Sequence, residues 1–546
     1  MNLKGELEKI IEGDVLDDAK TLDIYAKDAS IFRVQPKAVV FPKNTKDVMT
    51  LIKFVNEHKK EFPELSLTAR SAGTDMTGGP LNESIIVCFT TYFKKEEVNE
   101  EALTAIVEPG VFYREFEKIT LPEHISMPAY PASKSIAALG GMIMNNSAGE
   151  RSLRYGQIRN FVDEVSMVLA DGNEYTFGKL RLPELEDKKK LATFEGEVYR
   201  NICNLLEKNY DLIQKMKPKV SKNSAGYALW DVWDRKIFNM TQLFVGSQGT
   251  LGMLTRAKLR LIHDKPEKRL IVLFFKDWDL LPDVVNVILP YEPDSLEAFD
   301  NETLKLGIRF MPEIAKKVGE PLVSFALKFL PEVLIGIKMM GFPKLIMLVE
   351  LIEDSDEALN EKTKRIKEAI KDFDVYSRIA HDEDDAEKYW IMRRESFNLL
   401  RNHVRGKKAV PFVEDFCITP EKIPEFLPKM LAVLKMYGIK ANIAGHAGNG
   451  NFHIIPLMDL TKEEERAKIP VVADKIYDLI IEYGGTITAE HNDGIIRTPY
   501  LKKMFGNEMH ELFREVKQIF DPRNIFNPGK KVGGTIEYAK EHIDVA

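Results

Sequence analysis

The chain contains 546 residues, of which 44% are hydrophobic and 29% charged, and its formal net charge is −7. This length exceeds what one small core can organise, so we expect two or three domains, and the acidic balance argues against a nucleic-acid-binding protein. The isolated Cys88, Cys203 and Cys417 exclude a zinc finger or an iron–sulfur cluster built from this chain alone and fit a reducing compartment.

The first half alternates helical and strand-like patterns. The opening segment "MNLKGELEKIIEGDV" has no apolar signal region, which predicts a cytoplasmic protein. Apolar spacing predicts a helix over 45–60, with Thr45 as its candidate N-cap. Strand-like runs follow at 65–70, 84–90 and 102–110, and Asp171-Gly172 joins two further strands in a predicted hairpin. The charged segment His263–Arg269 is the predicted linker to the second half.

The second half also alternates strands and helices. Strand-like runs at 270–276 and 344–352 are separated by helical patterns, and a further helix is expected from about Asp384 to Val404. This order predicts a separate α+β domain over an antiparallel sheet.

One apolar stretch, Pro321–Leu351, invites a membrane interpretation. Lys328 and Lys338 interrupt it and Pro331 and Pro343 break it, so a spanning helix is not predicted. The first interpretation is a buried helix ending near Gly341 and followed by a strand. The alternative is an exposed apolar surface for a partner or a membrane face.

A glycine-rich loop, "TARSAGTDMTGG" at Thr68–Gly79, follows directly after a strand. Its bare backbone N–H groups and hydroxyls suit a pyrophosphate, although a turn without a ligand stays an alternative. The loop does not match the P-loop pattern. The string "GHAGNG" at Gly445–Gly450 is followed by a strand rather than a helix, which argues against a Rossmann dinucleotide site.

Three longer segments carry a family resemblance. They are "QPKAVVFPKNTKDV" at Gln35, Pro128–Gly172 with "GGMIMNNSAGERSLRYG", and "LFVGSQGTLG" at Leu243. Together they resemble FAD-linked dehydrogenases of the vanillyl-alcohol-oxidase superfamily, in the branch of D-lactate, glycolate and D-2-hydroxyglutarate dehydrogenases. The resemblance extends from Tyr25 to Asn527.

The resemblance implies an α+β fold with three parts. Residues 1–265 would form a two-lobed PCMH-type FAD-binding domain, residues 266–500 an α+β cap domain with an antiparallel sheet, and residues 501–546 a segment that returns to the FAD domain. Non-covalent FAD is implied, because the pyrophosphate loop contains no His or Cys. The implied FAD-binding residues are Arg70, Ser71, Ala72, Gly73, Thr74, Asp75, Thr77, Gly78, Gly79, Pro109, Gly110, Gly140, Gly141, Asn145, Asn146, Ala148, Gly149, Tyr155, Gly156, Gly246, Gln248, Gly252 and Asn527. Ser71 and Gln248 stand where the family usually has Gly and Glu, and neither change removes a backbone donor.

Two histidine clusters lie near the C-terminus. His446 and His453 flank the "AGNG" turn, so a hairpin would bring both imidazoles to one side, and Glu490 could complete a His/His/carboxylate set. Such a set suits zinc, iron(II) or manganese, although histidines with a purely structural role stay an alternative from spacing alone. The family resemblance implies that these three residues hold a divalent metal and that His491 is the catalytic base. Asn449 replaces the commoner Asp and Asn492 the commoner Gly.

The implied substrate carboxylate requires a cation. Arg393 follows Trp390 by three residues, as in the family pattern, whereas Arg394 is predicted to lie on a solvated helix face and Lys408 is a weaker candidate. His491 would remove the proton of the substrate hydroxyl, and its imidazole suits this role because the pKa of an imidazole lies near the working pH.

The resemblance thus predicts an FAD-dependent dehydrogenase that oxidises a small D-2-hydroxy acid, D-lactate first. The chain has no iron–sulfur cysteines and no nicotinamide motif, so electrons would pass to an iron–sulfur protein, an electron-transferring flavoprotein or a quinone. A peripheral contact with the inner face of a membrane is left open. Two other classes stay open: a non-redox flavoenzyme of the alkylglycerone-phosphate synthase type, and an FAD-binding electron-transfer or scaffold subunit.

Overall fold

Short apolar runs of the first half form two sheets in the computed structural model, which describes residues 2–403 and 407–545. The four-stranded sheet has the order β1-β2-β4-β3, and the five-stranded antiparallel sheet has the order β5-β6-β12-β8-β9. Their strands are β1 (Asp14–Leu16), β2 (Ala38–Phe41), β3 (Leu67–Arg70), β4 (Ile85–Cys88), β5 (Glu96–Asn99), β6 (Thr104–Val107), β8 (Val162–Val168), β9 (Glu174–Phe177) and β12 (Met253–Arg260). Two small two-stranded sheets pair β7 (Ile125–Ser126) with β13 (Ile262–His263) and β10 (Lys179–Arg181) with β11 (Ile237–Asn239).

The second half contains one eight-stranded sheet, ordered β17-β14-β16-β15-β20-β21-β18, with β19 also paired to β21. Every recorded pairing in it is antiparallel, which confirms the predicted antiparallel sheet. The strands are β14 (Glu267–Phe275), β15 (Ser295–Asp300), β16 (Leu345–Glu353), β17 (Val375–Ile379), β18 (Lys408–Ala409), β19 (Phe416–Cys417), β20 (Lys440–His446) and β21 (Asn451–Met458).

Helices cover both faces of this sheet. Successive side chains of a strand point to opposite faces. In β14, the side chains at 270, 272 and 274 therefore pack with α12 to α15 and α17, whereas those at 271, 273 and 275 belong to the other core with α11, α16 and α18. The near-continuous apolar run of β14 follows from this double burial. The helices are α11 (Leu281–Ile288), α12 (Asn301–Arg309), α13 (Met311–Val318), α14 (Leu322–Leu327), α15 (Leu330–Met339), α16 (Asp356–Ala369), α17 (Glu383–His403), α18 (Ile423–Met436) and α19 (Glu463–Glu482).

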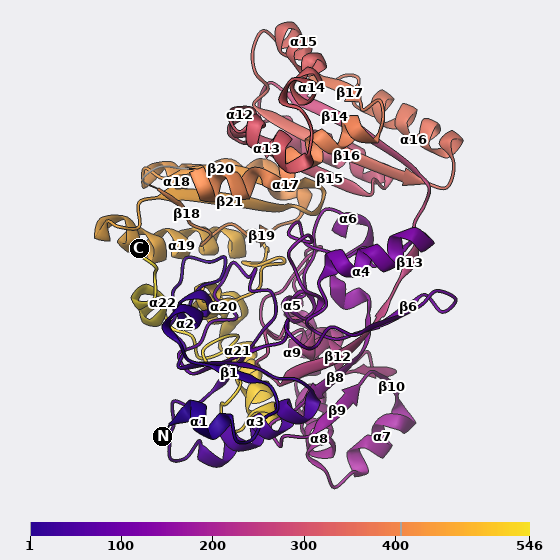
Figure 1. The fold of residues 1–546 in the computed structure, drawn as a ribbon. Coiled ribbons are helices and arrows are strands. Elements are labelled where there is room, and N and C mark those ends of the chain that lie inside the picture. Colours follow the sequence, from indigo (N-terminus) through magenta and orange to yellow (C-terminus); the bar gives the residue numbers. More distant parts are fainter. Residues whose placement is uncertain (1, 404–406, 546) are drawn as a thin grey trace.

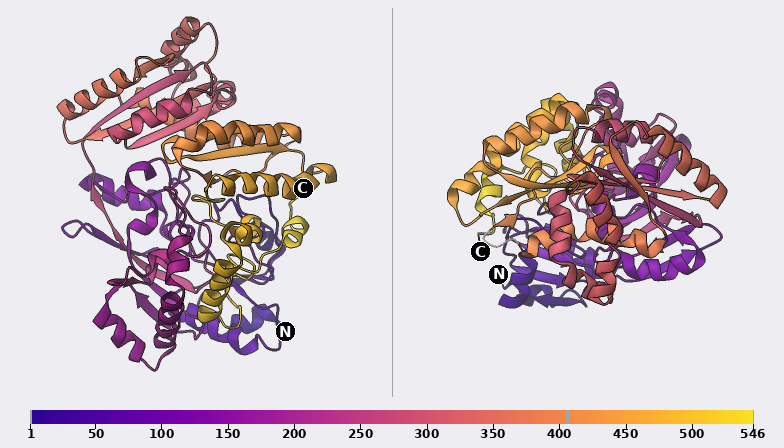
Figure 2. Two further views of the ribbon diagram at one scale, coloured as in Figure 1. Left: turned by 180° about the vertical axis from the view of Figure 1, so that it is seen from behind. Right: turned by 90° about the horizontal axis from the view of Figure 1, so that it is seen from above.

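The chain forms two stacked parts (Figure 1). The second-half sheet lies above the first half, and the view from behind shows the same arrangement (Figure 2). The first-half helices are α1 (Leu3–Leu7), α2 (Ala19–Tyr25), α3 (Thr45–His58), α4 (Tyr113–Thr120), α5 (Leu139–Asn145), α6 (Ser152–Tyr155), α7 (Leu182–Lys190), α8 (Phe194–Lys208), α9 (Tyr210–Lys215) and α10 (Thr241–Phe244).

The C-terminal segment runs back to the first half. It contains α20 (Gly494–Arg497), α21 (Leu501–Phe520) and α22 (Ile536–Glu541). Phe526 pairs with Leu67 next to β3, and Ile543 pairs with Phe32. The C-terminal segment therefore contacts the first half, and the division of the chain at 265 and 500 stays a prediction.

Several sequence predictions can be compared with these elements. The predicted Asp171-Gly172 hairpin is confirmed, with β8 and β9 paired and Gly172 at φ +72°. The N-cap of α3 is Asn44 rather than Thr45, because the Asn44 side chain accepts the N–H of Asp47. The predicted linker is shorter than His263–Arg269, since its two ends already belong to β13 and β14. The helix expected to end at Val404 is α17, and Val404 lies outside the described residues.

The prediction of a buried helix ending near Gly341 is wrong. The stretch forms two short helices, α14 and α15, whose outer side chains are exposed. The strand that follows is confirmed as β16. Among the described residues, no helix is both long and apolar enough to cross a bilayer.

Candidate active site

A cavity of about 1050 Å³ extends from the glycine-rich loops of the first half to the histidines of the second half. Thirteen of the predicted FAD-binding residues line it: Arg70, Ser71, Ala72, Gly73, Thr74, Asp75, Gly79, Pro109, Gly140, Gly141, Asn145, Ala148 and Gln248. Arg393, His453, Glu490 and His491 line the same cavity. Residues predicted separately for cofactor and chemistry therefore meet in one space.

The other ten predicted FAD-binding residues lie outside the cavity lining. They are Thr77, Gly78, Gly110, Asn146, Gly149, Tyr155, Gly156, Gly246, Gly252 and Asn527. Asn527 instead connects loops, because its Nδ2 donates to the carbonyls of Gly79 (2.9 Å) and Gln248 (2.6 Å). It thereby holds two parts of the cavity wall together.

The loop after β3 is tied down by its own side chains. Arg70 donates through Nη1 and Nη2 to the carbonyls of Tyr25 and Lys27, at 3.2 and 2.7 Å. The Asp75 carboxylate accepts the N–H of Thr77 at 2.6 Å. Burial, together with the charge of Asp75, raises the pKa of Asp28 to about 7.

The start of α5 approaches the 109–110 turn closely. A Cβ on Gly140 would lie 2.3 Å from Cβ of Pro109, so this contact requires glycine. A Cβ on Gly141 would meet only the Ser71 Cβ, at an ordinary 3.5 Å. Gly141 therefore leaves open cavity space rather than allowing a backbone contact.

The hairpin of β20 and β21 carries two of the predicted metal ligands. In its register Ala444 faces His453 and His446 faces Asn451, so both imidazoles are on one face of the sheet. Their ring centroids are 5.2 Å apart. The third imidazole, His491, comes from the loop before α20 and stacks on His453 with a centroid separation of 5.0 Å.

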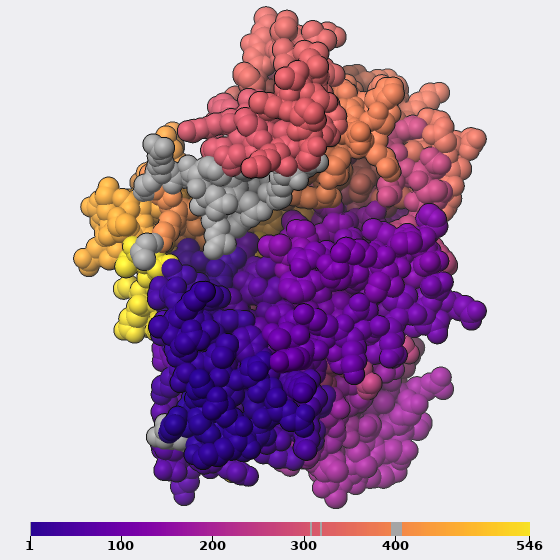
Figure 3. Space-filling view, in the orientation of Figure 1, coloured from indigo at the N-terminus to yellow at the C-terminus, as the bar shows by residue number. Residues whose placement is uncertain are grey.

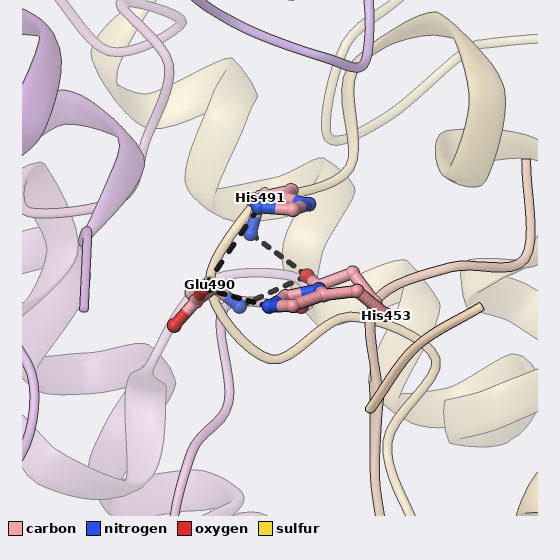
Figure 4. A group of neighbouring side chains, drawn as sticks. His453, Glu490 and His491 are labelled. Carbon is pink, nitrogen blue, oxygen red and sulfur yellow. Dashed lines mark hydrogen bonds and ion pairs between the residues drawn. The ribbon is translucent and has the colours of Figure 1, made fainter. Parts of the chain in front are cut away.

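Glu490 lies at the centre of this cluster, and Figure 4 shows it beside His453 and His491. Its Oε1 is 3.1 Å from Nε2 of His446 and 3.3 Å from Nε2 of His453. Its Oε2 accepts a hydrogen bond from the fully buried Lys222 ammonium at 2.8 Å. Two imidazole nitrogens thus approach one carboxylate oxygen, and these are donor types that first-row divalent cations bind.

The protonation states of His453 and Glu490 fit a metal ion. Burial lowers the pKa of His453 to about 4, against the opposing effect of Glu490, so its imidazole is neutral at pH 7. Burial raises the pKa of Glu490, but the charges of Lys222 and His446 outweigh it and hold that pKa well below its usual range. Neutral imidazole and ionised carboxylate are the forms that bind cations. For His446 burial lowers the pKa, but the charges of Glu297 and Glu490 outweigh burial and raise that pKa, which favours the imidazolium form in the absence of a cation.

Among the described residues, the side chains whose ligand atoms lie close enough together to hold one ion are Asp415, His453, Glu490 and His491, a group that contains His491 in place of the predicted ligand His446. However, Oδ2 of Asp415 accepts the backbone N–H groups of residues 489–491 at 2.7–2.9 Å and the Thr488 hydroxyl at 2.7 Å. Its Oδ1 accepts Nδ2 of Asn451 at 3.2 Å. Asp415 therefore holds the loop in place and has little lone-pair capacity left for an ion.

The predicted base, His491, has its own carboxylate partner. Its Nδ1 donates to Oε1 of Glu414 at 2.9 Å, and Glu414 is itself ion-paired with the fully buried Arg497. This bond leaves Nε2 as the nitrogen that can accept a proton. Burial lowers the pKa of His491, but the charge of Asp415 and the bond to Glu414 outweigh it and raise the pKa to about 9. The pKa of His491 in the protein without a bound cation is therefore higher than the value near the working pH that the sequence predicts.

Asn492, beside the base, has φ +71°, a backbone region where Asn is tolerated in place of Gly. Its Nδ2 donates to the carbonyls of Asn145 (3.0 Å) and Gly246 (2.9 Å). The substitution therefore keeps the loop geometry and connects the loop of the base to the first half.

The cationic candidates have different surroundings. Arg393 is buried, and its Nε and Nη2 contact Oε2 of Glu297 at 3.2 and 3.1 Å. Arg394 is half-buried and ion-paired with Glu150 at 2.7 Å, so the prediction of a solvated helix face is wrong for this residue. Lys408 lies outside the cavity lining, with its ammonium 3.3 Å from the carbonyl of Asp544.

Glu297, Glu414 and Lys222 were not identified from the sequence. Glu297 contacts both Arg393 and Nδ1 of His446 (2.6 Å) and so orients both. It lies in β15, where all six residues are buried. The available signal was an acid in the middle of a short strand between apolar neighbours, because such a buried charge must find a partner.

Two family models match the chain. The model described as an FAD binding domain matches residues 36–178, and that described as FAD linked oxidases, C-terminal domain, matches residues 265–531. The chain is 28% identical to the D-lactate dehydrogenase of Archaeoglobus fulgidus, over 97% of this chain and 99% of that protein. It is 26% identical to the glycolate oxidase subunit GlcD of Bacillus subtilis, over 97% and 96%.

The D-2-hydroxyglutarate dehydrogenases of Haemophilus influenzae and Escherichia coli are each 27% identical, over 95% and 97% of this chain. The chain spans about half the length of these two relatives, 50% and 51%. Among solved structures, a p-cresol methylhydroxylase has a TM-score of 0.68 at 17% identity, covering 97% and 96% of the two chains. An alkyldihydroxyacetonephosphate synthase has 0.66 at 15%, covering 97% and 86%. At these identities the structures establish the fold alone.

Proposed function

Because the chain belongs to the FAD-linked oxidase family, we propose that it oxidises a small D-2-hydroxy acid, D-lactate first, to the 2-oxo acid. One observation carries the proposal: the glycine loops predicted for FAD line the same cavity as His453, Glu490 and His491. The A. fulgidus relative, similar over nearly its whole length, is named a D-lactate dehydrogenase. We further propose non-covalent FAD and one divalent cation, zinc, iron(II) or manganese, as cofactors.

The residues present fit both groups. FAD would lie along the loops of Arg70–Gly79 and Gly140–Asn145, and the cation would be held by His446, His453 and Glu490. When bound, FAD accepts a hydride, and the divalent cation acidifies the substrate hydroxyl and counters the carboxylate charge around the base.

The chain itself supplies binding and proton transfer. Arg393, oriented by Glu297, binds the substrate carboxylate through its planar fork of donors. His491 accepts the hydroxyl proton at Nε2, because Glu414 fixes the proton on Nδ1. Asp415 holds the backbone of the base and of the neighbouring ligand in one position, so neither has to reorganise during the reaction.

The charges around the cavity favour a monocarboxylate. Besides Arg393, the described cavity lining contains six cations: Lys27, Arg70, Lys134, Lys328, Lys388 and Arg394. Arg70 donates to backbone carbonyls, and each of the others is already paired with a carboxylate. Arg394 contacts Glu150 at 2.7 Å, and Lys388 contacts Asp385 at 2.8 Å. A second substrate carboxylate would have to displace one of these pairs, which supports D-lactate over D-2-hydroxyglutarate.

Gly141→Val tests the proposed FAD site. The variant should fold, because a Cβ there meets only Ser71, but the added methyl groups should enter the cavity and lower bound flavin about tenfold or more. The flavin-to-protein absorbance ratio measures this. Gly336→Val is the matched control, since its Cβ also has only one ordinary contact at 3.5 Å and the residue lies outside the cavity lining. Equal flavin content in both variants would contradict the assignment.

Arg393→Lys should raise KM for the 2-hydroxy acid about 10- to 100-fold with a smaller change in kcat, because it removes the two-pronged donor but keeps the charge. Arg394→Lys, one residue along α17, should leave KM within a few-fold, since Glu150 engages that side chain. Steady-state kinetics separate the two. A larger KM change in the Arg394 variant would show that Arg394, and not Arg393, binds the substrate carboxylate.

Turnover with an artificial electron-accepting dye tests the substrate assignment. D-lactate, L-lactate, glycolate and D-2-hydroxyglutarate are compared at equal enzyme concentration. We expect the highest kcat/KM for D-lactate and a value about 100-fold lower for L-lactate. A higher kcat/KM for D-2-hydroxyglutarate would contradict the proposed substrate but not the proposed type of reaction. The physiological acceptor is proposed as a separate iron–sulfur protein, electron-transferring flavoprotein or quinone.

A further inference from the structure

The helical hairpin of α14 and α15 lies at the end of the molecule farthest from the first half (Figure 1; Figure 3, top). Its outer side chains form a concentrated apolar surface. Large apolar side chains on a protein surface are usually scattered singly. Here nine of the exposed ones fall within 21 consecutive residues, so the cluster is no random scatter. We define the hairpin patch as Leu322, Val323, Leu327, Leu330, Val333, Leu334, Ile337, Met340 and Phe342.

The inner side of the same hairpin is firmly packed. Phe325 and Phe329 are buried and meet edge to face, at 5.6 Å, in the core below α17. Glu332 accepts contacts from Arg378 at 3.2 Å and Lys388 at 3.0 Å. The inner side of the hairpin is therefore already packed in the core and held by ion pairs of Glu332. The exposed residues of the patch form the opposite side, which has no packing partner in the part of the chain that the structure describes.

The outer side has little with which a protein could form hydrogen bonds. In α14 and α15, the exposed polar or charged side chains are those of Ser324 and Lys338. Interfaces of transient protein complexes are about as polar as ordinary surface and carry many hydrogen bonds. An apolar face without such groups is better matched by the acyl boundary of a bilayer.

The charge around the patch has the opposite sign to that of the whole protein. Between residues 305 and 344 the sequence has seven Lys or Arg and three Glu, whereas the whole chain carries −7. Two of the three acids, Glu320 and Glu332, form ion pairs with basic side chains. Arg309, Lys316 and Lys338 have exposed side chains. A basic, apolar projection on an acidic protein is complementary to an anionic surface.

We propose that the hairpin patch is a docking site for an anionic lipid bilayer, with its apolar side chains in the acyl boundary and the neighbouring lysines at the phosphates. Neither helix is long enough to cross, so the hairpin would lie in the interface. Phe325 of α14 and Lys328, the residue that follows this helix, also line the active-site cavity. Docking would thus place one end of that cavity next to the membrane.

Vesicle flotation with the full chain tests this proposal. Vesicles of phosphatidylcholine alone are compared with vesicles that also contain phosphatidylglycerol, at low and high salt. We expect binding to the anionic vesicles that weakens with salt. Val323→Asp/Ile337→Asp should lower the partition coefficient about tenfold or more, and Lys338→Gln about fivefold on anionic vesicles only.

Matched controls keep the result interpretable. Val323 and Ile337 are 72% and 68% exposed, so the double variant should keep the melting temperature of the unmodified chain. Met436→Asp/Val471→Asp changes two exposed apolar residues of α18 and α19, away from the hairpin, and should bind vesicles normally.

Three outcomes would overturn the proposal. The first is that the unmodified chain binds neither vesicle type, and the second is that the hairpin variant binds as well as the unmodified chain. The third is a dimer in sedimentation velocity that dissociates in the hairpin variant without any vesicle binding, which would make the patch an interface between two copies.

Discussion

His491→Gln should lower kcat for the preferred 2-hydroxy acid by about 10²- to 10⁴-fold while FAD stays bound. The reason is geometric: Nε2 of His491 is the proton-accepting atom in the shared cavity, and Glu414 and Asp415 fix its ring and backbone. Glutamine keeps hydrogen bonding and approximate size but cannot accept a proton. Stopped-flow flavin reduction under anaerobic conditions measures the step directly.

His381→Gln is the matched control for this variant. The side chain of His381 is 89% exposed, pairs with Asp382 and is not part of the cavity lining, so flavin reduction should be unchanged. Flavin reduction by His491→Gln at the unmodified rate would show that this histidine is no base. Loss of both flavin and rate would indicate a collapsed loop, and a flavin content measurement distinguishes the two results.

His453→Ala should remove the bound cation and lower kcat about 10³-fold, because a metal contributes several kcal/mol to stabilising developing negative charge. His453 offers a neutral imidazole 3.3 Å from Oε1 of Glu490, and no other described imidazole replaces it on β21. Elemental analysis gives metal content, and chelation of the unmodified enzyme should reproduce the loss of activity. Added zinc, iron(II) or manganese should restore the chelated enzyme but not the variant.

His263→Ala controls for the general effect of removing an imidazole. His263 lies on the short strand β13, is exposed, and should leave metal content and kcat unchanged. Full activity in a chelated enzyme that elemental analysis shows to be metal-free would contradict the metal role and leave the cluster of Glu490 and its histidines as a hydrogen-bonded network.

Local patterns could be predicted well from the sequence. The Asp171-Gly172 turn and the alternation of strands and helices in the second half rest on short-range rules, and both are found in the structure. The exposure of α14 and α15 could not be predicted in this way. Apolar composition predicts burial, whereas the structure uses only one side of the hairpin for packing.

The residues predicted to bind the metal and to act as the base could be identified from the sequence, but the residues that hold them in place could not. His446, His453, Glu490 and His491 come from two compact motifs, and the structure brings their side chains together. The supporting groups are far away in the sequence: Glu297 is 149 residues from His446, and Lys222 is 268 from Glu490. Their roles depend on the pairing of β15 with β20 and on the contact between the two halves, which no local spacing encodes.

The most direct test of the central claim, that the imidazole–carboxylate cluster and a bound flavin act on one 2-hydroxy acid, is the visible spectrum of the purified protein under anaerobic conditions. D-lactate and L-lactate are added separately, before and after chelation. We predict bleaching of the flavin by the D-acid, loss of bleaching after chelation, and recovery on adding a divalent metal. A bound flavin that neither these acids, glycolate nor D-2-hydroxyglutarate bleach in any metal state would contradict the proposal and favour a non-redox flavoenzyme or an FAD-binding subunit.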